Sequence, residues 1–223
     1  RDPEMSRGLG DVYKRQLHLC HKLIELIPFR SIFHLKNVCE QLIMNLKERK
    51  GDLMELMEAI KTRRSVRKFT DEPVPREKLE KIIEAAMWAP SGQNLQPWYF
   101  VALTKDEDLA FLISEMGTTA FSERKKLEAR FKNNPEVVEE TLEFLSAMGG
   151  ARTILLAFLN KPTYSEDMIP SCIESVSAAM QNAVLMAHAE GIASCWVEAV
   201  CQAGDALHEK FAPEHGKLIG GII

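Results

Sequence analysis

Residues 63–67 read Arg63-Arg64-Ser65-Val66-Arg67, and residues 89–98 read Ala89-Pro90-Ser91-Gly92-Gln93-Asn94-Leu95-Gln96-Pro97-Trp98. The first string carries three cations and a hydroxyl group within five residues. The second is a polar loop bounded by proline and glycine. The residues between them have the apolar spacing of one amphipathic helix. The order of basic segment, helix, polar loop and apolar run is the pattern from which we interpret the rest of the chain.

The basic string is suited to binding a phosphate group. Arginine presents a planar fork of donors that can hold two phosphate oxygens at once. Arg63, Ser65 and Arg67 alternate along the chain. In an extended backbone their side chains would therefore share one side, and Arg64 would face elsewhere. The alternative interpretation is a solvated basic helix end, which the helix dipole would favour.

The polar loop is suited to approach by a flat ring. Pro90-Ser91-Gly92 offers a hydroxyl group and a backbone without a side chain. Asn94 and Gln96 add amide donors and acceptors that match the edge of a heterocycle. The alternative interpretation is an ordinary connection from helix to strand, and Trp98 would fill the core in either case.

Apolar spacing predicts helices and short buried strands. Helices are expected at residues 53–60, 79–87 and 173–190. The last of these is apolar almost all round, as in a helix inside a core. Residues 106–148 are helical by composition, with breaks expected at Gly117 and at Asn133-Asn134-Pro135. Strands are expected at residues 98–103, 153–159, 193–197 and 218–223, which gives an α+β or α/β sandwich.

Composition and charge exclude several classes of protein. The 223-residue chain is 46% hydrophobic and 27% charged, which is typical of a soluble globular protein. Its net charge of −4 and its pI of 5.9 leave no basic excess for binding nucleic acid. The five cysteines are scattered, so neither a disulfide framework nor a metal site is expected, and a cytoplasmic location fits best. No apolar run approaches the roughly 20 residues of a membrane span.

The front of the chain is expected to be non-native. Residues 1–16 have no periodicity and resemble translated sequencing-adaptor readthrough. Residues 17–53 are interpreted as a translated leader, because Lys47-Glu48-Arg49-Lys50-Gly51 can be encoded by a purine-rich ribosome-binding site and Met54 follows. The alternative is a genuine N-terminal helical extension. The folded domain is expected at residues 54–223.

Taken in chain order, the motifs resemble those of the nitroreductase family, FMN enzymes that oxidise NAD(P)H. The basic string matches the family's segment for the flavin phosphate and ribityl chain, and the loop matches a segment that reaches the flavin of the partner subunit. Residues 191–198 match a third segment, a strand that passes over the flavin. The resemblance thus implies these cofactor-binding residues: Arg63, Arg64, Ser65, Arg67, Pro90, Ser91, Gly92, Asn94, Trp196, Val197 and Glu198.

The resemblance also implies an architecture. The family fold is an α+β, three-layer α-β-α sandwich with a central, mostly antiparallel sheet and a long buried dimer helix, here around Gln181-Asn182. A bacterial-like homodimer with FMN at its interface is implied. The family usually continues past the last strand with a Gly-Tyr-Pro-like turn and a tail around the partner. The chain ends at Ile223, so this tail is expected to be missing.

The implied activity is that of an oxidoreductase. NADH or NADPH would give a hydride to flavin N5, and a small oxidant such as a nitroaromatic or a quinone would then take it, in a ping-pong order. The flavin carries the chemistry, so no catalytic residue is required. The alternatives are a flavin carrier without turnover, dehalogenation or ene reduction on the same scaffold, and a helical phosphate-binding domain without flavin.

Three further features have competing interpretations. His188 lies on the buried helix and is interpreted as a core histidine rather than a catalyst. Cys195 is interpreted as a packing residue rather than a nucleophile. Residues 106–148 would cap the substrate cavity, and the candidates to line it, with core packing as the alternative, are Phe111, Phe121, Phe131 and Phe144.

Overall fold

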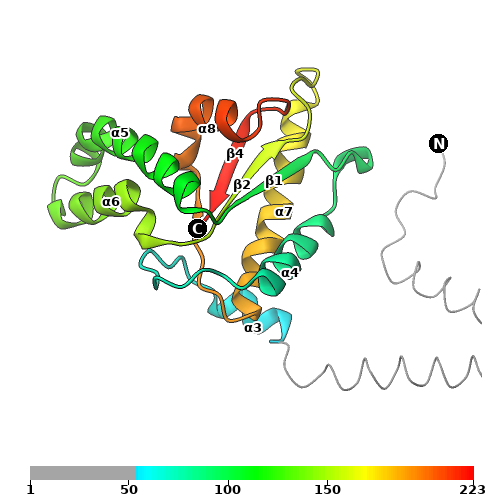
Figure 1. Cartoon of the computed structure of the whole chain (residues 1–223), viewed down its shortest axis with the longest axis horizontal. Coiled ribbons are helices and arrows are strands. Elements are labelled where there is room, and N and C mark those ends of the chain that lie inside the picture. Colours follow the sequence, from blue (N-terminus) through cyan, green and yellow to red (C-terminus); the bar gives the residue numbers. More distant parts are fainter. Residues whose placement is uncertain (1–53) are drawn as a thin grey trace, which may run out of the picture. The chain divides into compact units, whose positions relative to one another are not determined.

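The computed structural model describes residues 54–223, in which a four-stranded sheet lies between two layers of helices (Figure 1). The strands are β1 (Trp98–Leu103), β2 (Ile154–Leu159), β3 (Trp196–Val197) and β4 (Leu218–Ile222). Their spatial order is β1-β2-β4-β3, and every neighbouring pair is antiparallel. The expectations for residues 1–16 and 17–53 lie outside the described residues.

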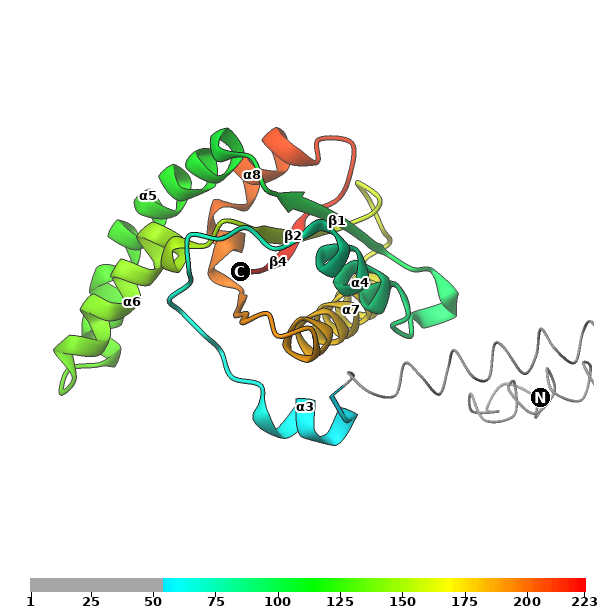
Figure 2. The same ribbon diagram turned by 60° about the horizontal axis from the view of Figure 1, so that its bottom comes forward.

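Helices cover both faces of this sheet (Figure 2). One face carries α4 (Arg76–Met87) and α7 (Ile169–Ala189). The other face carries α5 (Asp106–Arg130), α6 (Pro135–Ala147) and α8 (Gly204–Phe211). A further short helix, α3 (Leu56–Thr62), contacts α7. The three-layer α+β sandwich predicted by the resemblance is therefore confirmed.

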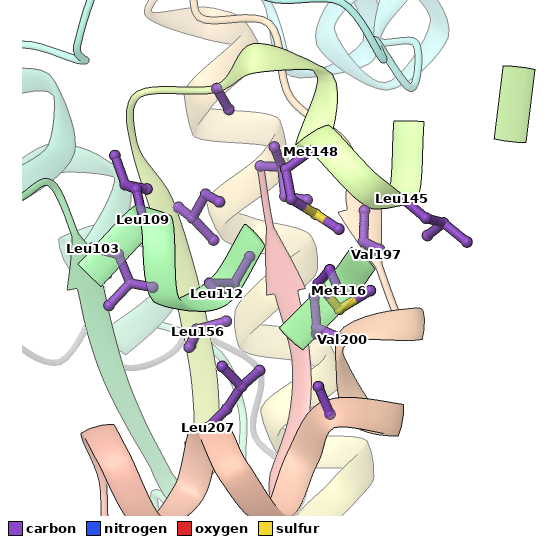
Figure 3. Packing of buried hydrophobic residues seen from close by; sticks show 14 of the residues in the cluster. Leu103, Leu109, Leu112, Met116, Leu145, Met148, Leu156, Val197, Val200 and Leu207 are labelled. Carbon is purple, nitrogen blue, oxygen red and sulfur yellow. The ribbon is translucent and has the colours of Figure 1, made fainter. Parts of the chain in front are cut away.

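The sheet separates two hydrophobic clusters. Every residue of β2 is buried, because its side chains alternate between the clusters, with Leu156 on one face and Leu155 on the other. This two-sided burial explains the unbroken apolar sequence of the strand. Figure 3 shows the cluster beneath α5, where Met116 lies beside Val197 and Val200.

The long apolar helix predicted at residues 173–190 is α7, which begins four residues earlier and ends at Ala189. The residues that it buries recur every three or four positions, and they include Val176, Ala179, Met180 and Ala183. Gly191 follows with φ of +73°, a conformation that ends a helix and that glycine adopts readily.

The prediction of a helix break at Gly117 is wrong. Helix α5 continues through this residue for 25 residues, from Asp106 to Arg130. A glycine inside a helix costs only about 1 kcal/mol relative to alanine, and the packing of α5 against α6 outweighs that cost. The break expected around Asn133-Asn134-Pro135 is confirmed, because α6 begins at Pro135.

Three of the expected strands are shorter than the pattern suggested, and β2 begins one residue late, at Ile154. Residues 193–197 contain only β3, because Ser194 instead forms an isolated bridge with Ser65 and the Cys195 backbone exchanges two hydrogen bonds with Ile223. The last strand ends at Ile222. Within residues 54–223, none of the helices combines the length and the apolar character that crossing a membrane requires.

Candidate functional site

The basic segment leaves α3 and joins the edge of the sheet. Ser65 forms a parallel bridge with Ser194, and the Val66 N–H donates to the Ser194 carbonyl oxygen at 3.1 Å. Ser194 lies two residues before β3, the strand at this edge. The structure therefore brings together the first and third of the expected cofactor-binding segments, which lie about 130 positions apart in the chain.

The basic segment lies beside Ser194 and Cys195. Burial raises the pKa of the Cys195 thiol, and Arg67, a hydrogen bond with Ser65, and Arg63 each oppose that rise. The bridge between Ser65 and Ser194 makes the segment extended at Ser65. The common orientation of Arg63, Ser65 and Arg67 stays a prediction.

The three arginines are free of carboxylates within residues 54–223: no ion pair there involves Arg63, Arg64 or Arg67. Arg64 instead caps α3, because its Nη1 donates to the carbonyl oxygens of Lys61 and Arg63 at 2.8 and 2.9 Å. The Arg67 guanidinium lies 6.0 Å from the ring centroid of Phe144. A cluster of positive charge without counter-charge favours an anionic ligand.

The backbone of the basic segment is held by Gly149, a residue that the sequence pattern did not single out. The Phe69 N–H donates to the Gly149 carbonyl oxygen at 3.0 Å. Gly149 has φ of +62°, and a Cβ at this position would lie 2.4 Å from the Arg67 carbonyl oxygen. Because Met148–Gly150 directly follows α6, the helical hairpin of α5 and α6 is tied to the arginines.

A hollow of about 410 Å³ opens beside the arginines, and we call it the arginine hollow. It is lined by Met54, Thr62, Arg63, Arg64, Val66, His188, Gly191, Ile192, Ala193 and Ser194. A second hollow, of about 350 Å³ and mostly apolar, shares its wall at residues 191–194. His188 is thus a half-buried residue at the end of α7 that faces a hollow, and its interpretation as a core histidine is wrong.

The polar loop adopts a strained conformation. Gln93, Asn94 and Gln96 have φ of +54°, +56° and +47°. Such values are uncommon for residues other than glycine, and they cluster at functional sites. The Gln96 N–H donates to Ser91 Oγ at 3.0 Å, and this bond braces the loop.

The loop and the basic segment lie at opposite ends of α7. The Gly92 N–H donates to Ser175 Oγ at 3.3 Å, near the beginning of the helix. At the other end, Thr62 Oγ1 lies 2.8 Å from His188 Nε2. Thirteen residues of helix separate Ser175 from His188, which is about 20 Å. Pro90, Ser91, Gly92 and Asn94 therefore do not meet the arginines within one chain.

The third segment offers mainly backbone to a ligand. Val197 is buried in the cluster beneath α5, so its side chain points into the core. Trp196 is half-buried, and Glu198 is exposed at the start of the turn Ala199–Ala203. Of the three residues, Glu198 is exposed, and Trp196 packs partly against the hydrophobic cluster beneath α7.

The three cysteines within residues 54–223 are not activated. Burial raises the pKa of Cys172 and Cys195, and burial together with Glu198 raises the pKa of Cys201 to about 11. A nucleophilic thiol needs a lowered pKa, so the interpretation of Cys195 as a packing residue agrees with its burial. Within residues 54–223, no group of three or more His, Cys, Asp and Glu side chains is placed to hold a metal ion.

The four phenylalanines proposed to line a cavity differ in exposure. Phe144 is buried, and Phe111 and Phe131 pack partly against the same cluster. Phe121, on α5, is 84% exposed. It borders a hollow of about 390 Å³ between α5 and α6. Among the four, Phe121 is the ring that is free to contact a ligand.

The structure thus presents an α+β sandwich with three arginines near one sheet edge that pair with no carboxylate of residues 54–223, an arrangement suited to an anionic ligand. The chain belongs to the nitroreductase family, because residues 60–219 match the family model described as "Nitroreductase family". It is 28% identical over 169 residues to "Putative NAD(P)H nitroreductase YfhC" of Bacillus subtilis (strain 168). This match covers 75% of this chain and 81% of that protein.

Two further relatives differ in what they bind or act on. A crystal structure from Desulfovibrio desulfuricans, of a "putative nitroreductase in complex with fmn", is 26% identical, with a TM-score of 0.56. The match covers 76% of this chain and 84% of that one. The "Iodotyrosine deiodinase 1" of Rattus norvegicus is 44% identical over 62 residues, which are 28% of this chain and 21% of that protein.

Proposed function

We propose that this protein is an FMN-dependent oxidoreductase that uses NADH or NADPH to reduce small oxidants, with nitroaromatics and quinones as the substrate class. The observation that carries the proposal is a set of three arginines at the edge beside β3 that have no carboxylate partner among residues 54–223. The NAD(P)H nitroreductase of B. subtilis and the FMN complex from D. desulfuricans support it. A cytoplasmic location is part of the proposal.

The residues present fit a flavin mononucleotide. Arg63 is half-buried beside the arginine hollow and would bind the phosphate. Ser65 and Arg67 follow two and four residues later and would bind the ribityl chain and the ring edge. Trp196 and Glu198 would flank the ring, and Val197 would contribute its backbone.

FMN bound here would supply the redox chemistry, in which a hydride from the nicotinamide reaches the oxidant by way of flavin N5. The protein's part is to bind and orient the reactants. The cysteines nearby have raised pKa values, and no protein acid or base is needed. We therefore expect ping-pong kinetics, with one binding place used in turn by the nicotinamide and the oxidant.

The polar loop completes the site only in a homodimer. In two copies related by a two-fold axis across α7, the loop of one copy lies near the arginines of the other, because loop and arginines occupy opposite ends of that helix. Apolar side chains are exposed at both ends: Leu56, Met57 and Ile60 on α3, and Met87 and Trp88 at the end of α4. Such exposed apolar residues are typical of an interface.

Phe121 would contact the oxidant. Its ring is exposed on α5, and α5 packs against the turn Ala199–Ala203 that follows β3 and Glu198. A flat aromatic substrate can stack on such a ring. The helical hairpin of α5 and α6 would thereby cap the substrate position, as the sequence pattern suggested.

The proposal is tested by anaerobic absorbance titration of the full chain with FMN and then with NADH or NADPH. We expect the flavin absorbance to bleach with the nicotinamide and to recover when a quinone or a nitroaromatic is added. Flavin that binds but never bleaches would instead identify a flavin carrier. Absence of FMN binding would refute the proposal.

A second candidate function is reductive dehalogenation, because the rat iodotyrosine deiodinase shares 44% identity over 62 residues with this chain. The reduced protein would then release halide from a halogenated phenol. Comparing the rates of flavin reoxidation by a halogenated phenol and by a nitroaromatic separates the two functions.

A further inference from the structure

The polar loop is fixed at its end by a residue outside the three expected segments. Asn160 directly follows β2, and its backbone N–H donates to the Pro97 carbonyl oxygen at 2.9 Å. Its side-chain Nδ2 donates to the Gln96 carbonyl oxygen, also at 2.9 Å. Asn160 therefore holds two successive carbonyl groups at the point where the loop enters β1.

The side-chain amide of Asn160 can face only one way. A carbonyl oxygen accepts hydrogen bonds and cannot donate them, so the amide nitrogen must lie toward Gln96. The amide oxygen then lies on the other side, where it accepts from the Tyr164 hydroxyl. Tyr164 is half-buried against the cluster beneath α7, and its burial raises the pKa of the hydroxyl, which keeps the donated proton in place.

Gln96 connects Asn160 to the rest of the polar loop. Its backbone N–H donates to Ser91 Oγ at 3.0 Å, and its Nε2 donates to Asn94 Oδ1 at 3.4 Å. Its φ of +47° is uncommon for a residue other than glycine. Such a conformation persists only where the surrounding contacts hold it, and here Ser91 and Asn160 hold the two backbone polar groups of Gln96.

Helix α7 anchors the other side of the loop. The Gly92 N–H donates to Ser175 Oγ at 3.3 Å, and a Cβ at Gly92 would clash with Ser171 Oγ. Gln93 and Asn94 lie between this anchor and Gln96, and both are exposed. The loop therefore presents the Asn94 amide to solvent from a backbone that is held on both sides.

We propose that Asn160, oriented by Tyr164, is a positioning residue that holds the polar loop in the conformation that binds the flavin ring of the second copy. It acts through Gln96, which in turn holds Asn94, and it does not contact the flavin itself. This inference rests on the proposed function, in which the loop completes the site of the other chain. A loop that is held in advance loses less conformational entropy when its ligand binds.

The test removes one donor from this chain of hydrogen bonds. Asn160→Asp keeps the shape of the side chain and still accepts from Tyr164, but it cannot donate to the Gln96 carbonyl oxygen. We expect the FMN dissociation constant, measured by fluorescence titration, to rise about tenfold. Tyr164→Phe, which lacks only the hydroxyl group, should cause a smaller rise.

Two comparisons control for the added charge. Riboflavin has the flavin ring but no phosphate, and its affinity for Asn160→Asp should fall by the same factor, because the amides of the loop suit the edge of the ring. Asn133→Asp makes the same chemical change in the exposed turn between α5 and α6. This control should bind both flavins as the wild type does.

A double-mutant cycle with Asn94→Ala distinguishes positioning from a general loss of stability. If Asn160 acts through Asn94, the effect of Asn160→Asp should disappear in the Asn94→Ala protein, so that the double variant binds FMN about as weakly as Asn94→Ala alone. Effects that multiply would overturn the inference, and so would a loss that FMN shows and riboflavin does not. If Asn160→Asp does not fold, Tyr164→Phe takes its place in the cycle.

The outcomes separate this inference from the proposed function. Wild type that binds neither FMN nor riboflavin would refute the proposed function, and the role of Asn160 would fail with it. Wild type that binds FMN, with Asn160→Asp and Tyr164→Phe indistinguishable from it, would refute the positioning role alone.

Discussion

The Arg63 guanidinium is half-buried beside the arginine hollow and has no carboxylate partner within residues 54–223. A charge that is partly withdrawn from water without a partner costs free energy. An anionic ligand recovers that cost, and this is why the residue is better explained by binding than by stability. By the same argument, removal of the guanidinium should affect the ligand more than the fold.

We predict that Arg63→Ala raises the FMN dissociation constant about 10- to 100-fold, because a charge-assisted contact to the phosphate is lost. Fluorescence titration with FMN measures the change. Arg76→Ala is the matched control, because Arg76 is an exposed arginine of α4 whose partner is Glu80, and it should leave FMN affinity unchanged. An Arg63→Ala protein that purifies with full flavin would refute the phosphate role.

The basic string could be selected from the sequence as a candidate site because its residue types are rare in one short stretch. Thr62 and His188 could not be, because their contact exists only once α3 packs against α7. The sequence places His188 on an apolar helix. It does not show that Thr62, rather than apolar core residues, contacts the end of this helix. Gly149 and the Arg67 contact with Phe144 escaped prediction for the same reason.

At the scale of elements, the turn Met148–Gly150 connects the hairpin of α5 and α6 to the basic segment. A Cβ atom at Gly149 would clash with the Arg67 carbonyl oxygen, at a distance of 2.4 Å. Gly117, in the middle of α5, has open space around the position of a Cβ. The two glycines therefore lie in the same hairpin layer but respond oppositely to one added methyl group.

We predict that Gly149→Ala destabilises the protein by about 1–3 kcal/mol, because it combines a positive φ with a clash against backbone. Its FMN affinity should also fall, because the Arg67 backbone must shift. Gly117→Ala should be neutral or stabilise by up to about 1 kcal/mol. Urea unfolding measures both free energies. Equal stability of the two variants would show that Gly149 does not hold the basic segment.

The existence of the main elements followed from apolar spacing, since α4, α7, β1 and β2 each have a long or continuous apolar pattern. The break wrongly expected at Gly117 shows the limit of local propensity, because about 1 kcal/mol of helix preference is small beside the packing of two long helices. The short β3 was beyond prediction, because its length depends on Ser194 pairing with Ser65.

At the scale of the whole molecule, α7 separates the basic string from the polar loop, the two strings that make up the candidate site. The polar loop contacts the beginning of this helix and the arginines lie at its end, as the position of α3 at the lower end of α7 in Figure 1 indicates. The sequence order of the motifs was sufficient to predict the family and the fold. The separation of the two strings within one chain became visible only with the length and placement of α7.

We predict that Ile60→Glu converts the proposed homodimer to a monomer, because it puts a charge among the exposed apolar residues of α3, where Ile60 is 49% exposed. The monomer should also bind FMN at least tenfold more weakly, because it lacks the polar loop of the second copy. Ala129→Glu adds the same charge to an exposed position of α5 and should leave both properties unchanged. Sedimentation velocity with and without FMN measures the association state. If the wild type is itself a monomer and binds FMN as tightly as Ile60→Glu does, one chain holds the flavin without the polar loop of a second copy. The dimeric site would then have to be abandoned.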